Sequence, residues 1–370
     1  MRLRVLLMPG DGIGPEVLRE ASKALHAVAL LFGHTLEAAE AAIGGASIDK
    51  AGVPLTVEAL AAAQKADATL LGAVGLKRYD SLPPERRPER GLLDLRKGLG
   101  VFANIRPSRT WPALLDVSPL KNDVANGAAL VFVRELTSGI YYGTPRGVTG
   151  TGADERAVYT LSYTRAEIDR VARIAFDLAR GRRARVTSVD KSNVLENSQL
   201  WRRVVTEVGR EYPDVRLDHM LVDNCAMQLV LNPRQFDVVL TENMFGDILS
   251  DEAAVLAGSI GMLASASLGA PRIPGEKTRQ GLYEPVHGSA PDIAGRGLAN
   301  PLGAIGSVAA MLDYSFGLKE ESAAVSRAID EVVASGRVTP DLRPSGTAAT
   351  TEQVGDAVCG AIAGCPNEKM

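Results

Sequence analysis

The sequence predicts an α/β protein with two domains and a mostly parallel sheet. Short apolar runs alternate along the chain with amphipathic segments of helical period, which is typical of a parallel α/β fold. The chain has 370 residues, more than one compact core of ordinary size holds, so two domains are expected. Composition gives no boundary between them, because no repeat or low-complexity linker interrupts the chain.

The expected elements follow from the positions of these runs. Apolar and β-branched runs predict strands at residues 4–8, 68–71, 129–133, 184–189 and 236–240. Amphipathic segments predict helices at residues 15–31, 165–180 and 196–211. Residues 142–163 break the alternation with Gly, Thr and the turn Thr144-Pro-Arg-Gly147, and we interpret them as an antiparallel arm used for subunit contact.

Composition excludes several functional classes. Hydrophobic residues make up 46% and the net charge is −3, so the chain resembles a soluble globular protein and lacks the basic surplus of a nucleic-acid binder. The first apolar run ends at Pro9-Gly10, too short for a signal-peptide core or a membrane span, and a cytoplasmic location is expected. Cys225, Cys359 and Cys365 form no even disulfide framework and no Cys-x-x-Cys pair, which fits a reducing compartment.

The segment TENMFGDILSD, residues 241–251, is the most informative motif. If it is helical from about Met244, Asp247 and Asp251 share one face just beyond the end of a strand. Two carboxylates held this close repel each other, so a bound cation is favoured, and oxygen ligands favour Mg²⁺ or Mn²⁺. The alternative is a solvated helix face, because acidic pairs at this spacing are common on surfaces.

A glycine-rich turn, GDGIGPE at residues 10–16, follows the first strand. It does not fit Gly-x-Gly-x-x-Gly, because Pro15 stands where the third-glycine region should begin a helix. Pro at a first helical position and three glycines still make a tight turn that can approach a phosphate or a nicotinamide. Turn geometry alone explains the same residues.

Three arginines stand beside apolar or strand segments: Arg96, Arg106 and Arg134. Each by itself is explained as a surface residue, since arginine is seldom buried. Together with the aspartate pair they indicate a pocket for a dicarboxylate, because guanidinium groups bind carboxylates through two parallel hydrogen bonds.

These motifs occur together in one known family. The chain resembles the β-decarboxylating dehydrogenases of 2-hydroxy acids, the isocitrate and isopropylmalate dehydrogenase family, in segments that run from end to end in the family's order. They are GDGIGPE (10–16), GLLDLRK (91–97), ANIRP (103–107), VRELTSGIYYG (133–143), VDKSNVL (189–195), TENMFGDILSD (241–251), GLYEPVHGSAPDIAGRGLANP (281–301) and DAV (356–358). The set is highly specific, although no single member is.

The resemblance implies an α/β fold in which two domains share one large mixed sheet without Rossmann topology. The first, cofactor-binding domain would comprise residues 1–101 plus 259–370. The second would comprise residues 102–258, with the dimer contacts and the antiparallel arm at about 142–163. It also implies a homodimer whose active sites borrow residues across the interface.

The resemblance further implies the ligands of a dicarboxylate substrate and of a divalent metal. Arg96, Arg106 and Arg134 would bind the substrate carboxylates. Asp247 and Asp251 of one subunit, with Asp223 of the other, would hold Mg²⁺ or Mn²⁺ against the substrate. The metal would lower the pKa of the substrate hydroxyl and stabilise the enolate left when CO₂ departs.

The same resemblance assigns the two proton transfers. Lys191 of the partner subunit would take the proton of the substrate hydroxyl, and Tyr141 would protonate the enol. From the residues alone, the favoured interpretation of Lys191 is a surface lysine after a strand, and that of Tyr141 is a core-edge residue with a satisfied hydroxyl.

Substrate choice depends on Glu89, Leu92 and Leu93, which the resemblance places against the variable group. Two leucines offer an apolar wall suited to an isopropyl group, whereas a third carboxylate against them would lose its hydration without a partner. We therefore expect isopropylmalate, and with it a role in leucine biosynthesis. Homoisocitrate, isocitrate and tartrate are the alternatives.

The cofactor is expected to be NAD. The resemblance places the dinucleotide against Ile13, Gly75, Glu89, Glu284, His287, Gly288, Ser289, Ala290, Asp292, Ile293 and Asn300. A carboxylate at Asp292 would accept hydrogen bonds from the ribose hydroxyls and repel the 2′-phosphate of NADP. NADP-using relatives have lysine and tyrosine where this chain has Asp292 and Ile293. The alternative is that Asp292 caps a turn after Pro291.

The chain departs from the family at a few positions. Cys225 stands where alanine is more frequent, beside Asp223, and is either a site of thiol oxidation or a buried, inert thiol. Ala264 occupies a common proline position. Residues 341–346 differ from the usual shorter glycine turn, which leaves a cofactor role for Asp341 open.

Two other classes of function are compatible with part of the sequence. A phosphoryl-transfer enzyme could use the turn at residues 10–14 with the aspartate pair and Mg²⁺, but the chain has no Gly-Lys-Ser/Thr triplet. A non-catalytic regulatory homologue would be expected to lose Lys191, Tyr141 or one of the three aspartates, and all are present.

Overall fold

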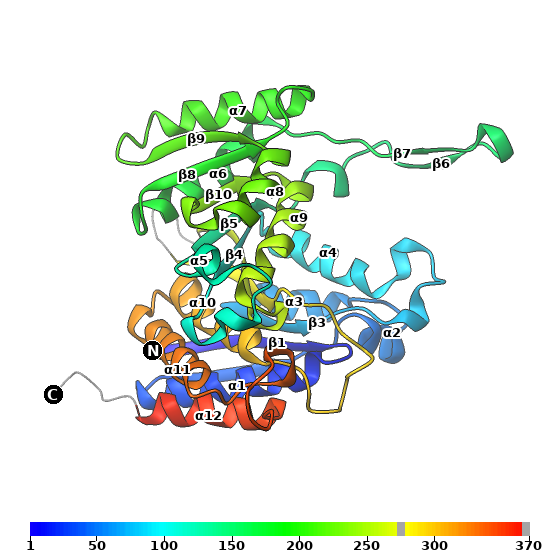
Figure 1. Ribbon diagram of the computed structural model, residues 1–370. Helices are drawn as coiled ribbons and strands as arrows, with labels where there is room; N and C mark the ends of the chain where they lie inside the picture. The colour runs from blue at the N-terminus through cyan, green and yellow to red at the C-terminus, as the bar shows by residue number, and fades with distance from the viewer. Residues whose placement is uncertain (272–277, 365–370) are drawn as a thin grey trace. The chain divides into compact units, whose positions relative to one another are not determined.

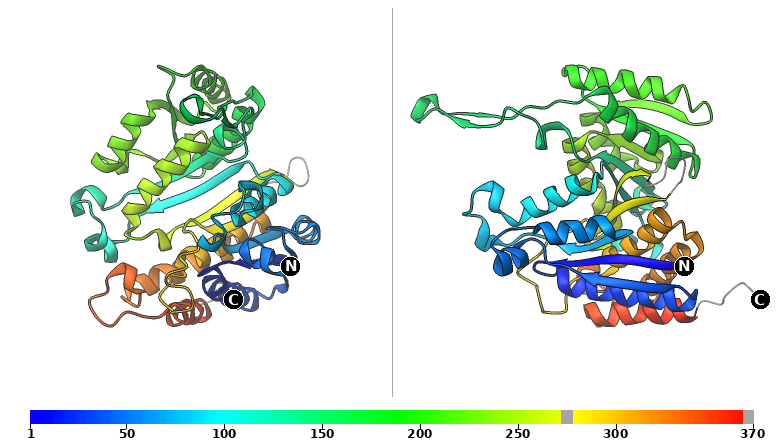
Figure 2. Two further views of the ribbon diagram at one scale, coloured as in Figure 1. Left: turned by 90° about the vertical axis from the view of Figure 1, so that its right-hand side faces the viewer. Right: turned by 180° about the vertical axis from the view of Figure 1, so that it is seen from behind.

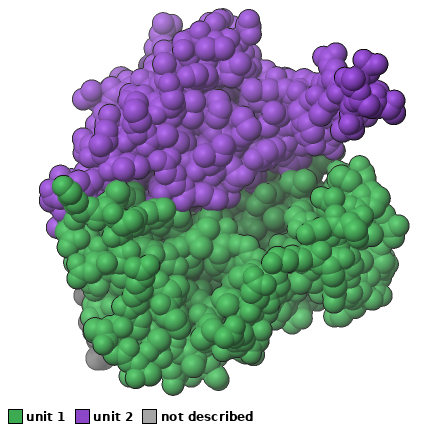
Figure 3. Space-filling view, turned by 45° about the vertical axis from the view of Figure 1, so that its right-hand side comes forward, with its two compact units in different colours: residues 1–101, 110–122, 254–370 green, residues 102–109, 123–253 purple. Residues whose placement is uncertain are grey.

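The structure, a computed structural model, describes residues 1–271 and 278–364. It divides into two compact units (Figure 3): unit 1 contains residues 1–101, 110–122 and 254–370, and unit 2 contains residues 102–109 and 123–253. Ten strands form one mixed sheet, which confirms the expected α/β class with a large mixed sheet. The expected domain ranges differ from these units at 110–122 and 254–258, and they stay a prediction.

The strands of unit 1 are ordered β2-β1-β3-β12-β11. β1 pairs in parallel with β2 and β3, β3 pairs in parallel with β12, and β12 pairs antiparallel with β11. Their bounds are β1 Arg2–Gly10, β2 Thr35–Glu40, β3 Ala68–Ala73, β11 Ala264–Pro271 and β12 Arg279–Pro285. Every residue of β3 is buried, as expected for a central parallel strand.

Helices cover the sheet of unit 1, and α1 and α12 lie side by side in both views (Figures 1 and 2). Their close approach depends on Gly355, where an added Cβ would lie 2.0 Å from Oε2 of the buried Glu20. The α-helices are α1 Gly14–Leu31, α2 Gly45–Ala51, α3 Val57–Lys65, α4 Pro88–Leu99, α10 Leu302–Phe316, α11 Lys319–Ala334 and α12 Thr351–Gly364. Short 3₁₀ turns are η1 Lys77–Tyr79, η2 Pro84–Arg86, η3 Pro112–Val117, η7 Val255–Ala257, η8 Ile260–Met262 and η9 Pro340–Leu342.

The strands of unit 2 are ordered β4-β5-β10-β8-β9. β4 and β5 are antiparallel, and the other pairs are parallel. The strands are β4 Ala103–Arg109, β5 Ala129–Glu135, β8 Arg185–Asp190, β9 Arg216–Leu221 and β10 Val238–Thr241. The helices are α5 Asn122–Ala125, α6 Arg165–Arg180, α7 Glu196–Gly209, α8 Val222–Leu231 and α9 Asn243–Ala254, with 3₁₀ turns η4 Gly139–Tyr141, η5 Gly152–Asp154 and η6 Pro233–Gln235.

The five expected strands and three expected helices are all confirmed, and their ends shift by two residues or fewer. Local chemistry explains why the boundaries of α6 are so clear in the sequence. Thr164 accepts a hydrogen bond from the backbone N–H of Glu167, and the Glu167 carboxylate accepts one from the backbone N–H of Thr164. The buried stripe of α6 repeats at helical spacing through Ile168, Val171 and Ala175.

An antiparallel arm projects from the rest of unit 2 (Figure 1). Its two strands, β6 Gly147–Thr149 and β7 Arg156–Val158, pair with each other. The arm exposes Val148 and Tyr159, which are 63% and 60% accessible. Among the helices of the described residues, none is long and apolar enough to cross a bilayer.

Candidate active site

Two strands of unit 2 present two of the three predicted arginines on one face. Arg134 of β5 stands opposite Asn104 of β4 in the antiparallel register, and Arg106 lies two residues beyond Asn104. Side chains two residues apart on a strand point to the same side, so Arg106 and Arg134 share a face of the sheet. Both are almost fully buried, at 9% and 3% exposure.

The helix α9 brings the predicted aspartates to these arginines. Arg106 Nη1 lies 3.1 Å from Asp251 Oδ1 and 3.5 Å from Asp247 Oδ1. Arg134 Nη1 donates to Asp247 Oδ1, and the Tyr141 hydroxyl donates to Asp247 Oδ2 at 3.1 Å. The expected helix from about Met244 is confirmed. Its i, i+4 aspartates pair with two buried arginines, while their own side chains stay 34% exposed at Asp247 and 54% exposed at Asp251.

Burial and charge shift the pKa values of this cluster. Loss of solvent raises the pKa of Asp251, Arg106 opposes that rise, and the neighbouring Asp247 adds to it. Loss of solvent also raises the pKa of Tyr141, and the charge of Asp247 adds to the rise. Tyr141 therefore keeps its proton at neutral pH, which is the state that a proton donor requires.

The other two predicted residues of unit 2 lie together at the ends of β8 and β9. Lys191 follows β8, and its Nζ lies 3.0 Å from Oδ1 of Asp223, near the start of α8. This lysine lowers the pKa of the largely exposed Asp223. Within residues 1–271 and 278–364, no three His, Cys, Asp or Glu side chains gather as a metal site. Asp223 thus does not join Asp247 and Asp251 within the chain.

The donor set of Asp247 and Asp251 nevertheless fits a divalent metal. One guanidinium nitrogen lies within 4.0 Å of a carboxylate oxygen of each aspartate, so the two carboxylates converge on a single cationic group. All the donors are carboxylate oxygens, the ligand type that Mg²⁺ and Mn²⁺ prefer. A third carboxylate from a second copy of the chain would complete the expected set.

In unit 1, α4 carries the residues expected to meet the substrate. Its inner face is buried through Gly91, Leu95 and Leu99, whereas Leu92 and Leu93 are only partly buried. Arg96 lies three and four residues beyond these leucines, hence on a neighbouring part of the helix surface. Its Nη2 donates to Glu284 Oε1 of β12 at 2.7 Å, so Arg96 is held in an ion pair with a residue expected near the cofactor.

The glycine turn after β1 packs against the segment expected to bind the cofactor. Ile13 N donates to Ser289 O at 2.8 Å, and an added Cβ at Gly12 would lie 2.0 Å from that same oxygen. Ser289 Oγ donates to Gly75 O at 2.6 Å. Hydrogen bonds therefore join the turn to Ser289 and Ser289 to Gly75, two positions expected to bind the cofactor.

Asp11, a residue that the sequence argument passed over, organises this turn. Its buried carboxylate accepts backbone hydrogen bonds from Gly45 at 2.8 Å, Ala46 at 2.9 Å and Gly75 at 2.9 Å. Asp11 therefore joins its own turn to the start of α2 and to the loop after β3. Its place inside the GDGIGPE motif is the only sequence signal for this role.

The segment from His287 to Asn300 has features that fit a dinucleotide. His287 is buried, its Nδ1 contacts Gly288 O at 2.9 Å, and its Nε2 has no hydrogen-bond partner among the described residues. Loss of solvent lowers the pKa of His287, so the ring is neutral at pH 7. An added Cβ at Gly288 would meet nothing within 4 Å, which leaves open space beside the histidine.

Asp292 is highly exposed, and its nearest cation is Lys77 at 3.6 Å. Asp292 lies within a turn in which Ile293 N donates a hydrogen bond to Ala290 O at 3.1 Å. Ala290, two residues earlier, has a φ of 36°, a conformation that a non-glycine residue rarely adopts. Strained backbone of this kind occurs often at ligand-binding segments.

Two departures from the family pattern are explained by the structure. Cys225 is fully buried on α8, and burial raises the pKa of its thiol to about 12. The buried, inert alternative for this cysteine is therefore favoured, since the thiolate is the reactive form. Asp341 accepts hydrogen bonds from Asn300 Nδ2 at 3.1 Å and Thr339 Oγ1 at 2.5 Å, so it supports a residue expected at the cofactor. Cys365 lies outside the described residues.

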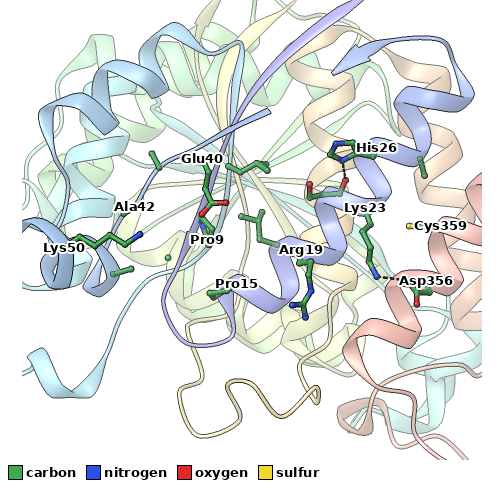
Figure 4. Close-up of a pocket in the computed structure, with 17 residues that line it drawn as sticks. Pro9, Pro15, Arg19, Lys23, His26, Glu40, Ala42, Lys50, Asp356 and Cys359 are labelled. Atoms are coloured by element: carbon green, nitrogen blue, oxygen red, sulfur yellow. Dashed lines mark hydrogen bonds and ion pairs between the residues drawn. The ribbon is translucent and has the colours of Figure 1, made fainter. Parts of the chain in front are cut away.

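A separate groove of about 910 Å³ lies on unit 1 between α1, α2 and α12 (Figure 4). On one side Lys23 of α1 pairs with Asp356 of α12 at 2.6 Å. None of the predicted substrate, cofactor or metal residues lines it. The groove is therefore distinct from the candidate active site.

Comparison with known proteins finds relatives over nearly the whole chain. The sequence model of the isocitrate/isopropylmalate dehydrogenase family matches residues 4–358. The 3-isopropylmalate dehydrogenases of Halalkalibacterium halodurans and Bacillus subtilis are each 53% identical over 363 residues, covering 98% of both chains. The crystal structure of isocitrate dehydrogenase from Methylococcus capsulatus is 34% identical with a TM-score of 0.85, covering 98% of this chain and 99% of that one.

The matching family model and relatives define an oxidoreductase that acts on CH–OH groups of a small molecule and needs a nucleotide cofactor and a divalent metal. The chain belongs to the isocitrate/isopropylmalate dehydrogenase family. The resemblance drawn from the motifs is thereby confirmed.

Proposed function

We propose that the chain catalyses the NAD-dependent oxidative decarboxylation of (2R,3S)-3-isopropylmalate to 4-methyl-2-oxopentanoate and CO₂ in leucine biosynthesis, in the cytoplasm. The observation that carries this proposal is the convergence of Asp247 and Asp251 on Arg106, with Arg134 and Tyr141 both bonded to the Asp247 carboxylate. It joins carboxylate recognition, metal ligation and a proton donor in one cluster. The curated relatives named above support the choice of reaction.

The buried arginines bind and orient the malate half of the substrate. Arg106 and Arg134 offer guanidinium edges from neighbouring strands, and Arg96 offers a third from α4. Charge-assisted pairs of this kind fix the two carboxylates, and so fix C2 and C3 between them. Partly buried Leu92 and Leu93 provide apolar surface for the isopropyl group, while a third carboxylate there would be desolvated without a partner.

The two proton transfers are assigned to Lys191 and Tyr141. Lys191 of one subunit takes the hydroxyl proton as C2 is oxidised and its hydride leaves. The C3–carboxylate bond then breaks, CO₂ departs, and the electron pair of that bond forms the enolate. Tyr141, which keeps its proton at neutral pH, protonates C3 to give the 2-oxo acid.

Asp247 and Asp251, with Asp223 of a second subunit, would hold Mg²⁺ or Mn²⁺. When bound there, the metal would supply Lewis-acid polarisation of the hydroxyl oxygen and stabilisation of the enolate charge, and NAD would supply the hydride acceptor. The exposed carboxylate of Asp292 would favour a free ribose 2′-hydroxyl over a 2′-phosphate.

A homodimer is supported by two exposed apolar surfaces of unit 2. Met227, Val230 and Leu231 of α8 are 56%, 45% and 66% exposed, and Ile248 of α9 is 61% exposed. Large apolar side chains on neighbouring positions of a surface helix mark protein contacts. The arm with Val148 and Tyr159 adds a second such surface, and a two-fold contact would let each copy lend Lys191 and Asp223 to the other.

Product analysis tests the reaction directly. Purified protein incubated with isopropylmalate, NAD and Mn²⁺ is expected to form NADH, CO₂ and 4-methyl-2-oxopentanoate in equal amounts, and chelation of the metal should stop all three. NADH formed without CO₂ would mean oxidation without decarboxylation and would contradict the assignment.

A further inference from the structure

Asn243, the first residue of α9, is fully buried beside the candidate site. Its Oδ1 accepts two hydrogen bonds from Arg134, from Nε at 3.0 Å and from Nη2 at 2.7 Å. Its Nδ2 donates to Leu136 O and Ser138 O, both at 3.0 Å. An asparagine amide has two donor hydrogens and two acceptor lone pairs, so all four capacities are used. The reversed amide would place NH₂ against the guanidinium, which fixes its orientation.

Arg134 is held from a second side by Gly246. An added Cβ at Gly246 would lie 2.7 Å from Cγ and 2.8 Å from Cβ of Arg134, so only glycine admits the arginine stem at this place. With the stem confined and the Nε/Nη2 edge bound to Asn243, Nη1 is directed to Asp247. The direction of the guanidinium is therefore set before any ligand arrives.

The carbonyls that Asn243 binds belong to the segment leading to Tyr141. Leu136 and Ser138 follow β5 directly, and η4 with Tyr141 begins at the next residue, Gly139. Gly139 has a φ of 75°, a left-handed conformation suited to glycine, so the chain turns sharply here. A tether at 136–138 thus determines where this turn starts and where the tyrosine hydroxyl lies.

We infer that Asn243 is a positioning residue that couples the direction of the Arg134 guanidinium to the placement of Tyr141. This inference rests on the proposed function of those two residues. Asn243 itself is fully buried and its side-chain amide is fully bonded within the protein, so it acts through these two residues. It lets one buried amide align the group that binds the substrate and the group that protonates the product, and such alignment governs rate when reacting groups must be held to a fraction of an ångström.

Two substitutions separate the two halves of this coupling, which are the hydrogen bonds from Arg134 to Oδ1 and the hydrogen bonds from Nδ2 to the carbonyls of Leu136 and Ser138. Asn243→Asp keeps an acceptor for Arg134 but loses both donors and sets a carboxylate against the carbonyls of Leu136 and Ser138. We expect kcat to fall about tenfold or more, with a smaller change in KM for isopropylmalate. Asn243→Leu removes both halves, so kcat should fall and the KM for isopropylmalate should also rise about tenfold or more. The KM for NAD should stay within about twofold in both variants.

Tyr163→Phe is the matched control, because it removes a hydrogen bond donated by the backbone N–H of Asn243 and leaves the bonds of the Asn243 side-chain amide in place. The Tyr163 hydroxyl accepts from Asn243 N at 2.9 Å and donates to Glu242 Oε2 at 3.2 Å. Its loss should lower the thermal midpoint while the kinetic constants stay within about twofold of wild type. Asn243→Ser, which retains one acceptor, replaces Asn243→Leu if the leucine variant does not fold.

The outcomes separate this inference from the proposed function. If the KM for isopropylmalate and the KM for NAD changed together in the Asn243 variants, Asn243 would have a structural role only and the inference would be overturned. The same would follow if Tyr163→Phe lowered kcat or raised the KM for isopropylmalate while leaving the KM for NAD unchanged. Asn243 variants with wild-type kinetics would overturn it as well, while leaving the reaction intact. A wild-type protein that neither binds nor oxidises isopropylmalate would overturn the proposed function, and the inference with it.

Discussion

The hydroxyl of Tyr141 donates a hydrogen bond to the carboxylate of Asp247 at 3.1 Å. This contact joins the proposed proton donor to a proposed metal ligand, and the other oxygen of the same carboxylate pairs with Arg134. Metal binding and proton donation are therefore coupled through one side chain. A change at Asp247 should disturb both, whereas a change at Asp251, which contacts Arg106, should disturb metal binding more selectively.

We therefore expect Asp251→Asn and Asp247→Asn to lower activity sharply, because each removes a ligand charge. Raised Mn²⁺ should restore much of the activity of Asp251→Asn and less of that of Asp247→Asn. Activity measured across a Mn²⁺ titration checks this order. Wild-type turnover of either variant at ordinary metal concentration would exclude that aspartate as a ligand.

A shared active site predicts complementation between inactive variants. Lys191→Met protein mixed with Asp247→Asn protein, under conditions that exchange subunits, should regain activity, because each heterodimer contains one site with both defects and one with neither. Subunit exchange is followed by mass spectrometry of the intact dimer. If exchange occurs and activity does not return, Lys191 and Asp247 serve the same subunit's site.

Cofactor choice is expected to depend on Asp292 and Ile293. The native protein should prefer NAD by orders of magnitude, and Asp292→Lys combined with Ile293→Tyr should erode this preference chiefly through KM, because the carboxylate no longer repels a 2′-phosphate. Steady-state kinetics with both cofactors measure the effect. Similar kcat/KM values for NAD and NADP in the native protein would remove the role given to Asp292.

Glu135 gives a prediction for stability against pH. Burial raises its pKa to about 7, from an ordinary value near 4.5. The folded state therefore binds a proton that the unfolded state releases between about pH 4.5 and 7, so this group stabilises the fold at low pH and its contribution is lost as pH rises through 7. The loss is on the order of 3 kcal/mol.

Glu135→Gln should flatten this part of the stability curve, because the amide keeps the size of the side chain and cannot ionise. Urea unfolding at pH 5 and pH 7.5, at one protein concentration, measures the difference. The exposed Glu85→Gln serves as the control and should keep the native slope. An equal slope in native and Glu135→Gln protein would show that Glu135 ionises normally.

The sequence predicted those parts of the fold whose local signals agree with their tertiary surroundings. The buried strands β5 and β10 are continuous apolar runs, and α6 begins with a capping box. β2 gives no such signal, because it is an exposed edge strand with acidic residues. β4 is similarly obscured, since Pro107 lies within it.

Site residues could be predicted from the sequence where a motif contains the charged or reactive side chain itself. They could not be predicted where a residue acts by positioning another residue. Asp247, Asp251 and the arginines stand out by charge and spacing. Asn243 and Asp11 lie in the same motifs, but their roles depend on burial and on backbone groups brought from distant segments. No periodicity or spacing in a single sequence records those contacts.

Substrate choice is tested most directly by kcat/KM for NADH formation with isopropylmalate, isocitrate, homoisocitrate, tartrate and malate, measured side by side at saturating NAD and Mn²⁺. Isopropylmalate should be the best substrate, and isocitrate, with its third carboxylate facing Leu92 and Leu93, should be poorer by about tenfold or more. A higher kcat/KM for isocitrate, homoisocitrate or tartrate would contradict the proposed function.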